Sequence, residues 1–382
     1  MQFPSDIQAA LLFDRRVACL DSAMRTFMRI EQARTGIPFN VVEAKSNIFY
    51  RLFGGGELMV TLEYVDGPTN PEVFQQTLSS TITGVLFPDV RQRLMTNRSH
   101  ILVNVSHGAL GSGLSPDIMK FLNKIDYRME GQSLPEFQRR LEVCALISRI
   151  ICDEQPPQAV HWTQSNQLIP GENFETCAQG DTPGPLHIHP YLFGNATDQD
   201  GKAKIGIRTF GARHFIGREI LIEPSILPWA ANYQTILAFL AVATTKNGYV
   251  IPDGDTFGPE DRSLSYRVLH REAEEGDVPL CELEPLMFRE YNFVAEDYVP
   301  PERVFDDRSA PVDLMPSEDG DKSELISEWR QKRAMAEGIG GRFEVRARDP
   351  GQGSPPPAPP IRPGSPLAGV PGARPVFGRK RG

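Results

Sequence analysis

Two histidines separated by a single residue, His187 and His189, are the first candidates for chemistry in this sequence. They stand in LHIHPYLF (186–193), whose alternation predicts a strand, and alternate residues of a strand share one face. Two imidazoles on one face could bind a zinc ion. The further ligands would come from His161, His214, Asp181 and Asp253. The competing interpretation is a strand with outward histidines and inward apolar residues.

A glycine-rich stretch, VNVSHGALGSGLSPD (103–117), is the second candidate site. A strand, a loop with Gly108, Gly111 and Gly113, and a helix start could together cradle a phosphate with backbone N–H groups. The glycine order differs from the dinucleotide fingerprint, no Gly-Lys-Ser/Thr follows, and Asp117 would repel an anion. A loop before a well-capped helix is the alternative.

The segment PDGDTFGPED (252–261) resembles a calcium loop through Asp253, Asp255 and Asp261. It lacks the closing Glu and the third early ligand of such a loop. Asp-Gly pairs are typical of turns. We therefore interpret this segment as a structural turn.

Nucleophilic catalysis has little support in the sequence. No Gly-x-Ser-x-Gly elbow is present, and Ser106 and His107 are neighbours on one predicted strand, so their side chains face opposite ways. Cys177 stands in a predicted polar loop and could be a reactive thiol. Cys144 and Cys152, within a predicted apolar helix, are expected to be buried free thiols.

The elements that must position these residues alternate between strands and helices. Hydrophobic periodicity predicts helices over 21–34, 70–80, 134–151 and 228–245. It predicts strands over 7–14, 39–44, 48–52, 57–64, 100–106, 159–162, 186–193, 204–209 and 218–222, with strands or short helices over 265–272 and 287–293. Adjacent strands among helices indicate an α+β fold with mixed or antiparallel sheets.

Several stretches read in order carry a family resemblance: AVHWTQSNQLIPGENF (159–174), IGIRTFGARHFIGREILIEPS (205–225) and NGYVIPDGDTFG (247–258). Trp162, Phe210–Gly211, Glu219 and Asp253–Gly258 stand at its characteristic places. Over residues 5–275 the chain resembles the bacterial family called domain of unknown function 4261. The resemblance implies an α+β fold in a bacterial cytoplasmic protein and supplies no activity or catalytic residues.

Composition limits the classes of function. The chain has 382 residues and a formal net charge of −9, with 40% hydrophobic residues. The first residues lack the pattern of a signal peptide, and no apolar run is long enough to span a bilayer. We therefore expect a cytoplasmic protein. An acidic body disfavours a broad nucleic-acid surface, because phosphate contacts need clustered Lys and Arg.

The C-terminal end differs from the rest. Seventeen of the 33 residues over 350–382 are Pro or Gly, and residues 341–382 carry a net charge of +6. We expect disorder over 345–382. A protein partner could bind its last residues, Pro375, Phe377, Arg379, Lys380 and Arg381. The alternatives are a solubilising end, or one that folds back on the acidic stretch 296–328.

Together these observations predict two α+β subdomains, 1–155 and 156–295, an acidic linker with a short helix over 296–344, and a tail over 345–382. We expect a non-enzymatic adaptor or interaction module that binds another protein. One alternative is an enzyme or a ligand- or metal-binding protein with a site between the halves near His187 and His189. Another is an immunity or secretion-associated binding protein. The sequence identifies no cofactor.

Overall fold

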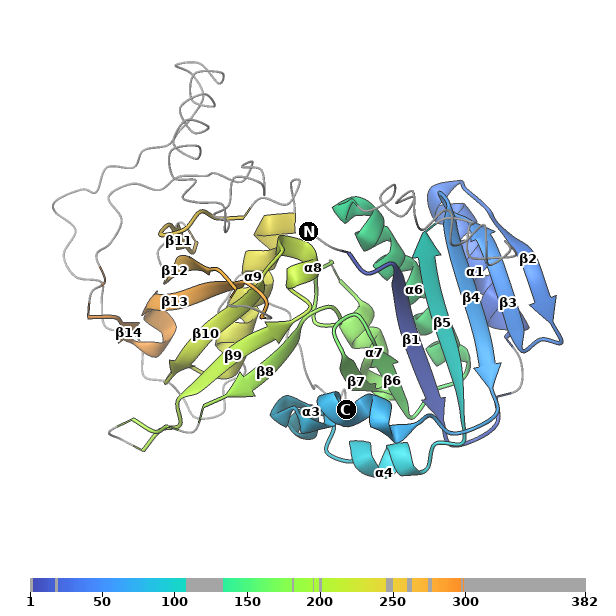
Figure 1. The fold of residues 1–382 in the computed structure, drawn as a ribbon, viewed down its shortest axis with the longest axis horizontal. Coiled ribbons are helices and arrows are strands. Elements are labelled where there is room, and N and C mark those ends of the chain that lie inside the picture. Colours follow the sequence, from blue (N-terminus) through green and yellow to red (C-terminus); the bar gives the residue numbers. More distant parts are fainter. Residues whose placement is uncertain are drawn as a thin grey trace, which may run out of the picture. The chain divides into compact units, whose positions relative to one another are not determined.

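The computed structural model describes residues 3–17, 20–107, 133–180, 182–194, 196–198, 201–244, 250–259, 263–273, 277–296 and 298. The chain divides into two compact units, Met1–Tyr191 and Leu192–Gly382. Each unit combines a sheet with helices (Figure 1). The predicted α+β class is confirmed.

The first unit contains a sheet in which every pair of neighbouring strands is antiparallel. Within the described residues its strand order is β2-β3-β4-β5-β1-β6-β7. The strands are β1 (Asp6–Phe13), β2 (Phe39–Lys45), β3 (Phe49–Gly54), β4 (Leu58–Val65), β5 (Ser99–His107), β6 (Ala159–Trp162) and β7 (Gln167–Pro170). The predicted boundary at residue 155 places residues 159–162 in the second subdomain. They lie here instead because β6 pairs with β1, a long-range contact that no local pattern reveals.

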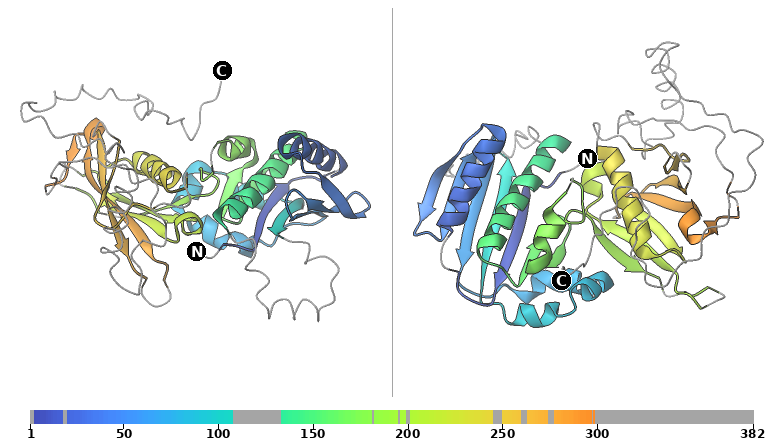
Figure 2. Two further views of the ribbon diagram at one scale, coloured as in Figure 1. Left: turned by 90° about the horizontal axis from the view of Figure 1, so that it is seen from above. Right: turned by 180° about the vertical axis from the view of Figure 1, so that it is seen from behind.

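Helices cover one face of this sheet (Figure 2). They are α1 (Asp21–Thr35), α6 (Leu134–Glu154) and α7 (Gly171–Ala178). A capping box fixes the start of α6, because Ser133 Oγ accepts the N–H of Glu136 while the Glu136 carboxylate accepts the N–H of Ser133. Buried apolar side chains of α6 pack on β1 and β5. Cys144 and Cys152 are among them, so the expectation of buried free thiols is confirmed.

Among the described residues, four short helical elements cover part of the opposite face of the first sheet. A 3₁₀ turn, η1 (Pro71–Phe74), is followed by α2 (Gln75–Ser79), α3 (Thr81–Leu86) and α4 (Val90–Met95). Their apolar residues form a core with β1, β6 and β7, whose buried members are Ala10, Leu12, Phe74, Phe87, Val90, Ala159 and Leu168. The sequence predicts one helix over 70–80. Asn70 does cap its start, accepting the N–H of Glu72 at 3.0 Å, but the first turn is 3₁₀.

The second unit holds a mixed sheet with the order β11-β12-β13-β10-β9-β8, and β14 pairs with β13. The strands are β8 (His189–Phe193), which crosses the boundary between the units, β9 (Ile205–Phe210), β10 (Glu219–Ser225), β11 (Thr256–Phe257), β12 (Leu264–Arg271), β13 (Leu280–Phe288) and β14 (Phe293–Val294). Strands β10 and β13 are parallel. The helical elements are α8 (Arg213–Ile216), α9 (Trp229–Thr244) and η4 (Arg289–Tyr291). Tyr266 of β12 donates a hydrogen bond to Asn232 of α9 at 2.8 Å.

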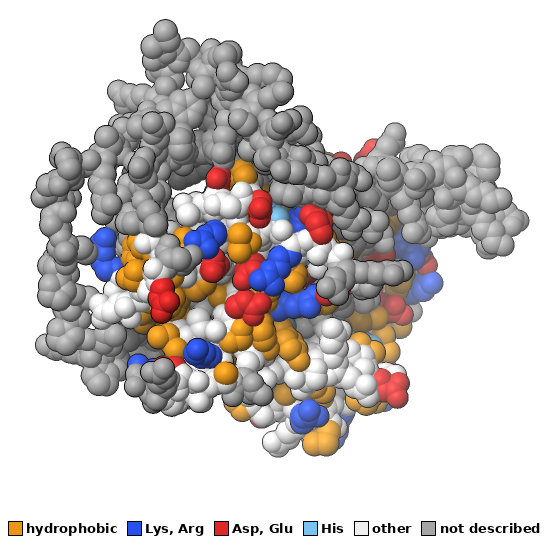
Figure 3. Space-filling model, turned by 60° about the vertical axis from the view of Figure 1, so that its left-hand side comes forward, with side chains coloured by type: hydrophobic (Ala, Val, Ile, Leu, Met, Phe, Trp, Pro, Cys, Tyr) orange, Lys and Arg blue, Asp and Glu red, His pale blue; other side chains and the backbone are white. Residues whose placement is uncertain are grey.

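Several charged side chains on and beside the second sheet form ion pairs. Arg267 bonds Glu284 at 2.8 Å, and Arg208 bonds Asp277 at 2.7 Å. Figure 3 shows a face of the molecule on which Lys and Arg side chains lie close to Asp and Glu side chains. Such neighbouring opposite charges compensate each other instead of building a field of one sign.

Candidate functional site

The histidines predicted to share a strand face do not stand on one regular strand. Strand β8 begins at His189, and His187 lies in the turn before it. In this turn the N–H of His187 bonds the carbonyl of Gly184 at 2.9 Å, and the N–H of Gly184 bonds Nδ1 of His187 at 3.1 Å. The alternation of apolar residues therefore does not place the two imidazoles on one strand face.

The imidazoles of His161, His187 and His189 are buried in the first unit. His189 Nε2 lies 2.9 Å from Ser80 Oγ, and His161 Nε2 lies 3.2 Å from Asn166 Oδ1. The rings of Phe74 and His161 pack edge to face, with their centroids 5.1 Å apart. Burial lowers the pKa of His187 to about 3 and that of His189 to about 4, so both are neutral at pH 7.

His214 is buried in α8 of the second unit, and the predicted ligand Asp253 has a structural partner. Asp253 lies in the second unit, where its carboxylate accepts the backbone N–H of His270 at 2.6 Å within a turn. The interpretation of residues 252–258 as a structural turn is in line with this contact. In the part of the chain that the structure describes, no three His, Cys, Asp or Glu side chains are grouped to hold a metal ion.

Cys177 is not in a polar loop as predicted. It lies in α7, buried, and burial raises the pKa of its thiol to about 12. A thiol that is protonated and shielded from solvent is a poor nucleophile. The sequence prediction failed because α7 is short, spanning only residues 171–178.

Other predicted site residues lie outside the described residues. They are Gly108, Gly111 and Gly113 of the phosphate candidate, Asp181, Asp261, and the tail positions Pro375, Phe377, Arg379, Lys380 and Arg381. These stay predictions.

A hollow of about 230 Å³ lies on the first sheet, on the face opposite α1 and α6. We call the part of the sheet surface that contains this hollow the polar face. Its lining residues are Asp6, Gln8, Arg51, Met59, Thr61, Glu63, Leu102, Asn104 and Ser106. They come from four neighbouring strands, β3, β4, β5 and β1. The register places Gln8 opposite Asn104 and Asn104 opposite Thr61, so these three side chains form a row across the strands.

The polar face is not among the sites predicted from the sequence, although the sequence contains a signal for it. In β5, Asn104 and Ser106 alternate with the buried Val103 and Val105. A period of two predicts a half-buried strand whose polar residues share the outer face. What the pattern lacks is the order of the strands, which decides that Asn104 has Gln8 and Thr61 as neighbours.

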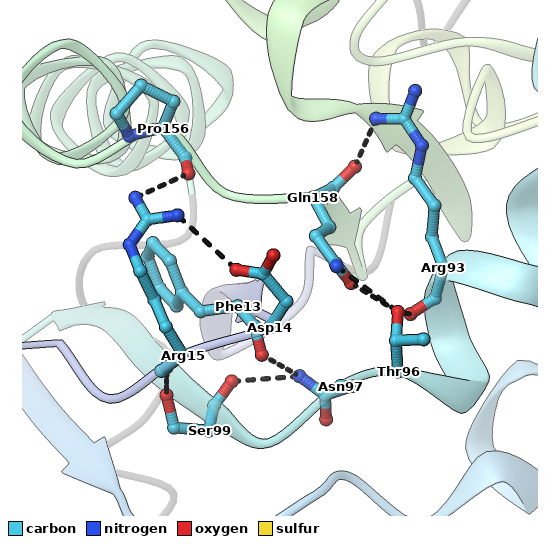
Figure 4. Close-up of polar contacts among 9 residues, drawn as sticks. All are labelled: Phe13, Asp14, Arg15, Arg93, Thr96, Asn97, Ser99, Pro156 and Gln158. Carbon is cyan, nitrogen blue, oxygen red and sulfur yellow. Dashed lines mark hydrogen bonds and ion pairs between the residues drawn. The ribbon is translucent and has the colours of Figure 1, made fainter.

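A polar cluster at the end of β1 has a structural explanation (Figure 4). The side-chain amide of Asn97 donates to the carbonyls of Phe13 at 3.1 Å and Ser99 at 2.8 Å. Ser99 Oγ donates to the carbonyl of Arg15 at 2.6 Å, and the Arg15 guanidinium donates to that of Pro156 at 3.3 Å. These bonds satisfy backbone groups where the strand ends, as buried or crowded peptide groups require.

The edge of the first sheet at β2 exposes apolar side chains. Val41 is 43% exposed and Val42 is 52% exposed, and Ile37 and Ile48 on either side are 48% and 46% exposed. The pairing with β3 shifts between Val41 and Glu43, so Val42 is an extra residue in the strand. Ten large hydrophobic residues are exposed over the described chain, and these four fall within residues 37–48.

Comparisons with known proteins add no assignment. No family model, curated protein or solved structure matches this chain. The resemblance of residues 5–275 to the domain of unknown function 4261 family therefore stays a prediction. Among the described helices, none has the length and apolar character needed to cross a membrane.

Proposed function

We propose that this protein is a protein-binding module that takes up an extended segment of a partner along β2. This proposal rests on the concentration of exposed apolar side chains on β2, a strand that has only one neighbour, β3, among the described residues. An edge strand leaves a row of backbone N–H and C=O groups without a neighbour. An added strand pairs with such a row, and its side chains supply specificity.

The two edges of the first sheet differ in a way that favours β2. Strand β7 at the other edge has four residues and ends in Pro170, which has no N–H to donate. Strand β2 has seven residues, FNVVEAK, and no proline. It is the longer and more apolar template.

The charges on β2 do not block an incoming strand. The Glu43 carboxylate bonds Lys45 at 2.8 Å and Arg51 at 2.8 Å. Charged side chains usually protect a sheet edge by repelling another strand. Here the acid is neutralised by its neighbours, so the exposed valines dominate the edge.

The test compares what the full-length protein captures from lysate with what two matched variants capture. Val42→Lys places a charge on the edge, and Val85→Lys makes the same change on α3, where Val85 is 59% exposed. We expect wild type and Val85→Lys to capture the same proteins. The captured amount of at least one of them should fall tenfold or more with Val42→Lys. Equal capture by all three would contradict the proposal.

Light scattering on the purified proteins tells whether the edge of β2 binds a second copy of this chain or a different protein. A wild-type dimer that Val42→Lys converts to a monomer would identify a second copy of the chain, in place of a different protein, at this edge. If wild type is a monomer and Val42→Lys no longer captures the partner proteins, the proposal is supported as stated.

A further inference from the structure

We infer that the hollow on the polar face binds a small, uncharged, polyhydroxylated molecule of about monosaccharide size. This site is separate from the β2 edge and does not depend on the function proposed there.

The hydrogen-bonding groups of the hollow are available. Gln8, Thr61, Asn104 and Ser106 are each only partly exposed, yet within the described chain none of their side chains bonds another residue. Two of these side chains are amides and two are hydroxyls, and both kinds can donate and accept. Partly buried polar groups without partners gain most from a ligand that offers both functions.

The row of Gln8, Asn104 and Thr61 runs across three neighbouring strands. Strands in a sheet lie about 4.8 Å apart, so the row spans about 10 Å. One six-membered ring with its hydroxyl groups can bridge this length. Met59 and Leu102 add apolar surface beside the row, against which the C–H groups of such a ring would pack.

The charges around the hollow disfavour an anion. Arg51 is its one cationic lining residue among those described, and the Glu43 carboxylate holds it at 2.8 Å. Asp6 and Glu63 add acceptors for hydroxyl groups at the margin. A phosphate or carboxylate group would face these two carboxylates without a free cation.

The volume limits the ligand. At about 230 Å³ the hollow is below the roughly 300–1,000 Å³ of pockets for drug-sized ligands. A nucleotide or a cofactor of similar size would extend beyond it, whereas a single sugar ring fits these dimensions.

The test is saturation-transfer NMR on the full-length protein with methyl glycosides of glucose, galactose, mannose and N-acetylglucosamine. Each is used at about 10 mM, which fills most of a site with millimolar affinity. We expect transfer to at least one glycoside. The 6-phosphate or uronic acid form of the same sugar should bind at least tenfold more weakly.

Two variants locate the binding. Asn104→Leu removes the amide at the centre of the row while keeping the size of the side chain, and should raise the Kd at least tenfold. Gln32→Leu removes an exposed amide on α1 and should leave the Kd unchanged. Circular dichroism checks that both variants fold. No transfer to any glycoside, equal binding of the charged forms, or an unchanged Kd in a folded Asn104→Leu would each overturn the inference.

Discussion

The hydroxyl oxygen of Ser80 lies 2.9 Å from Nε2 of His189, and both side chains are buried. Ser80 directly precedes α3, and His189 is the first residue of β8. Burial keeps the imidazole neutral, so the contact is a bond between two neutral groups. It ties the start of α3 to the segment at the end of the first unit.

Acid should destabilise the first unit through its buried histidines. Burial lowers the pKa of His189 to about 4, whereas an unfolded chain has a histidine pKa of about 6.5. Below pH 6.5 the unfolded state binds the extra proton, so the free energy of unfolding falls as the pH falls toward 4. Each such histidine contributes a slope of about 1.4 kcal/mol per pH unit.

Urea unfolding of wild type and His189→Gln between pH 7 and pH 5 measures this effect. The variant removes one titrating group. The slope of its unfolding free energy against pH should therefore correspond to about one proton fewer taken up on unfolding. Identical slopes would show that His189 is protonated in the folded protein or exposed by local opening.

The buried carboxylate of Glu219 should contribute strongly to the stability of the second unit. It accepts Thr209 Oγ1 at 2.7 Å and the backbone N–H groups of Gly211 at 2.9 Å and Ala212 at 3.0 Å. Glu219→Gln turns one acceptor into a donor that faces these donors. We expect a loss of about 2 kcal/mol in unfolding free energy.

Glu223→Gln, on the same strand, is the matched control. Its half-exposed carboxylate lies 3.6 Å from Arg271, a pair that contributes at most about 1 kcal/mol. In chemical denaturation, the unfolding free energy of Glu219→Gln should therefore be well below that of Glu223→Gln. Equal losses would mean that the three donors around Glu219 find other acceptors.

Two glycines of the first unit should respond oppositely to alanine. A Cβ on Gly171 would lie 1.9 Å from the carbonyl oxygen of Pro157, whereas one on Gly84 would meet nothing within 4 Å. Gly171→Ala should cost at least about 2 kcal/mol, because the backbone must move apart. Gly84 is an exposed position of α3, so Gly84→Ala should stabilise the protein by about 0.5–1 kcal/mol. Thermal unfolding should show a lower Tm for Gly171→Ala and a higher Tm for Gly84→Ala than for wild type.

Arg93 should matter more than its ion-pair partner Glu172. Its guanidinium bonds both carboxylate oxygens of Glu172, at 2.8 and 2.7 Å, and also Asp89 and the carbonyl of Gln158. It lies over the ring of Phe87 as well. Glu172→Ala leaves these other contacts and should cost under about 1 kcal/mol. Arg93→Ala removes them all and should cost roughly twice as much or more in urea unfolding.

Local patterns in the sequence predicted most individual elements. The strand over 159–162 and the start of the helix at Asp21 agree with the structure, because alternation and helical periodicity act within a few residues. The pattern misled at Leu186–Ile188, where the backbone bonds with Gly184 form a turn that side-chain types do not signal.

The candidate site was harder to predict than the elements. Gln8, Asn104 and Thr61 are ordinary polar residues on three strands, and only the pairing of β1, β4 and β5 makes them neighbours. His161 and His189 drew attention by their residue type, yet both are buried and hydrogen-bonded inside the first unit. Residue type suggests chemistry, and long-range strand pairing decides whether that chemistry assembles.

The central place of β1 in the first sheet has a consequence for synthesis. The ribosome joins residues 6–13 well before their neighbours in the sheet, residues 99–107 and 159–162. This apolar strand therefore has no partner on its β6 side until residues 159–162 have been joined. Such distant pairing slows folding and leaves apolar surface open during translation. A nascent chain of this protein therefore presents a substrate for chaperones for as long as the middle of its first sheet is incomplete.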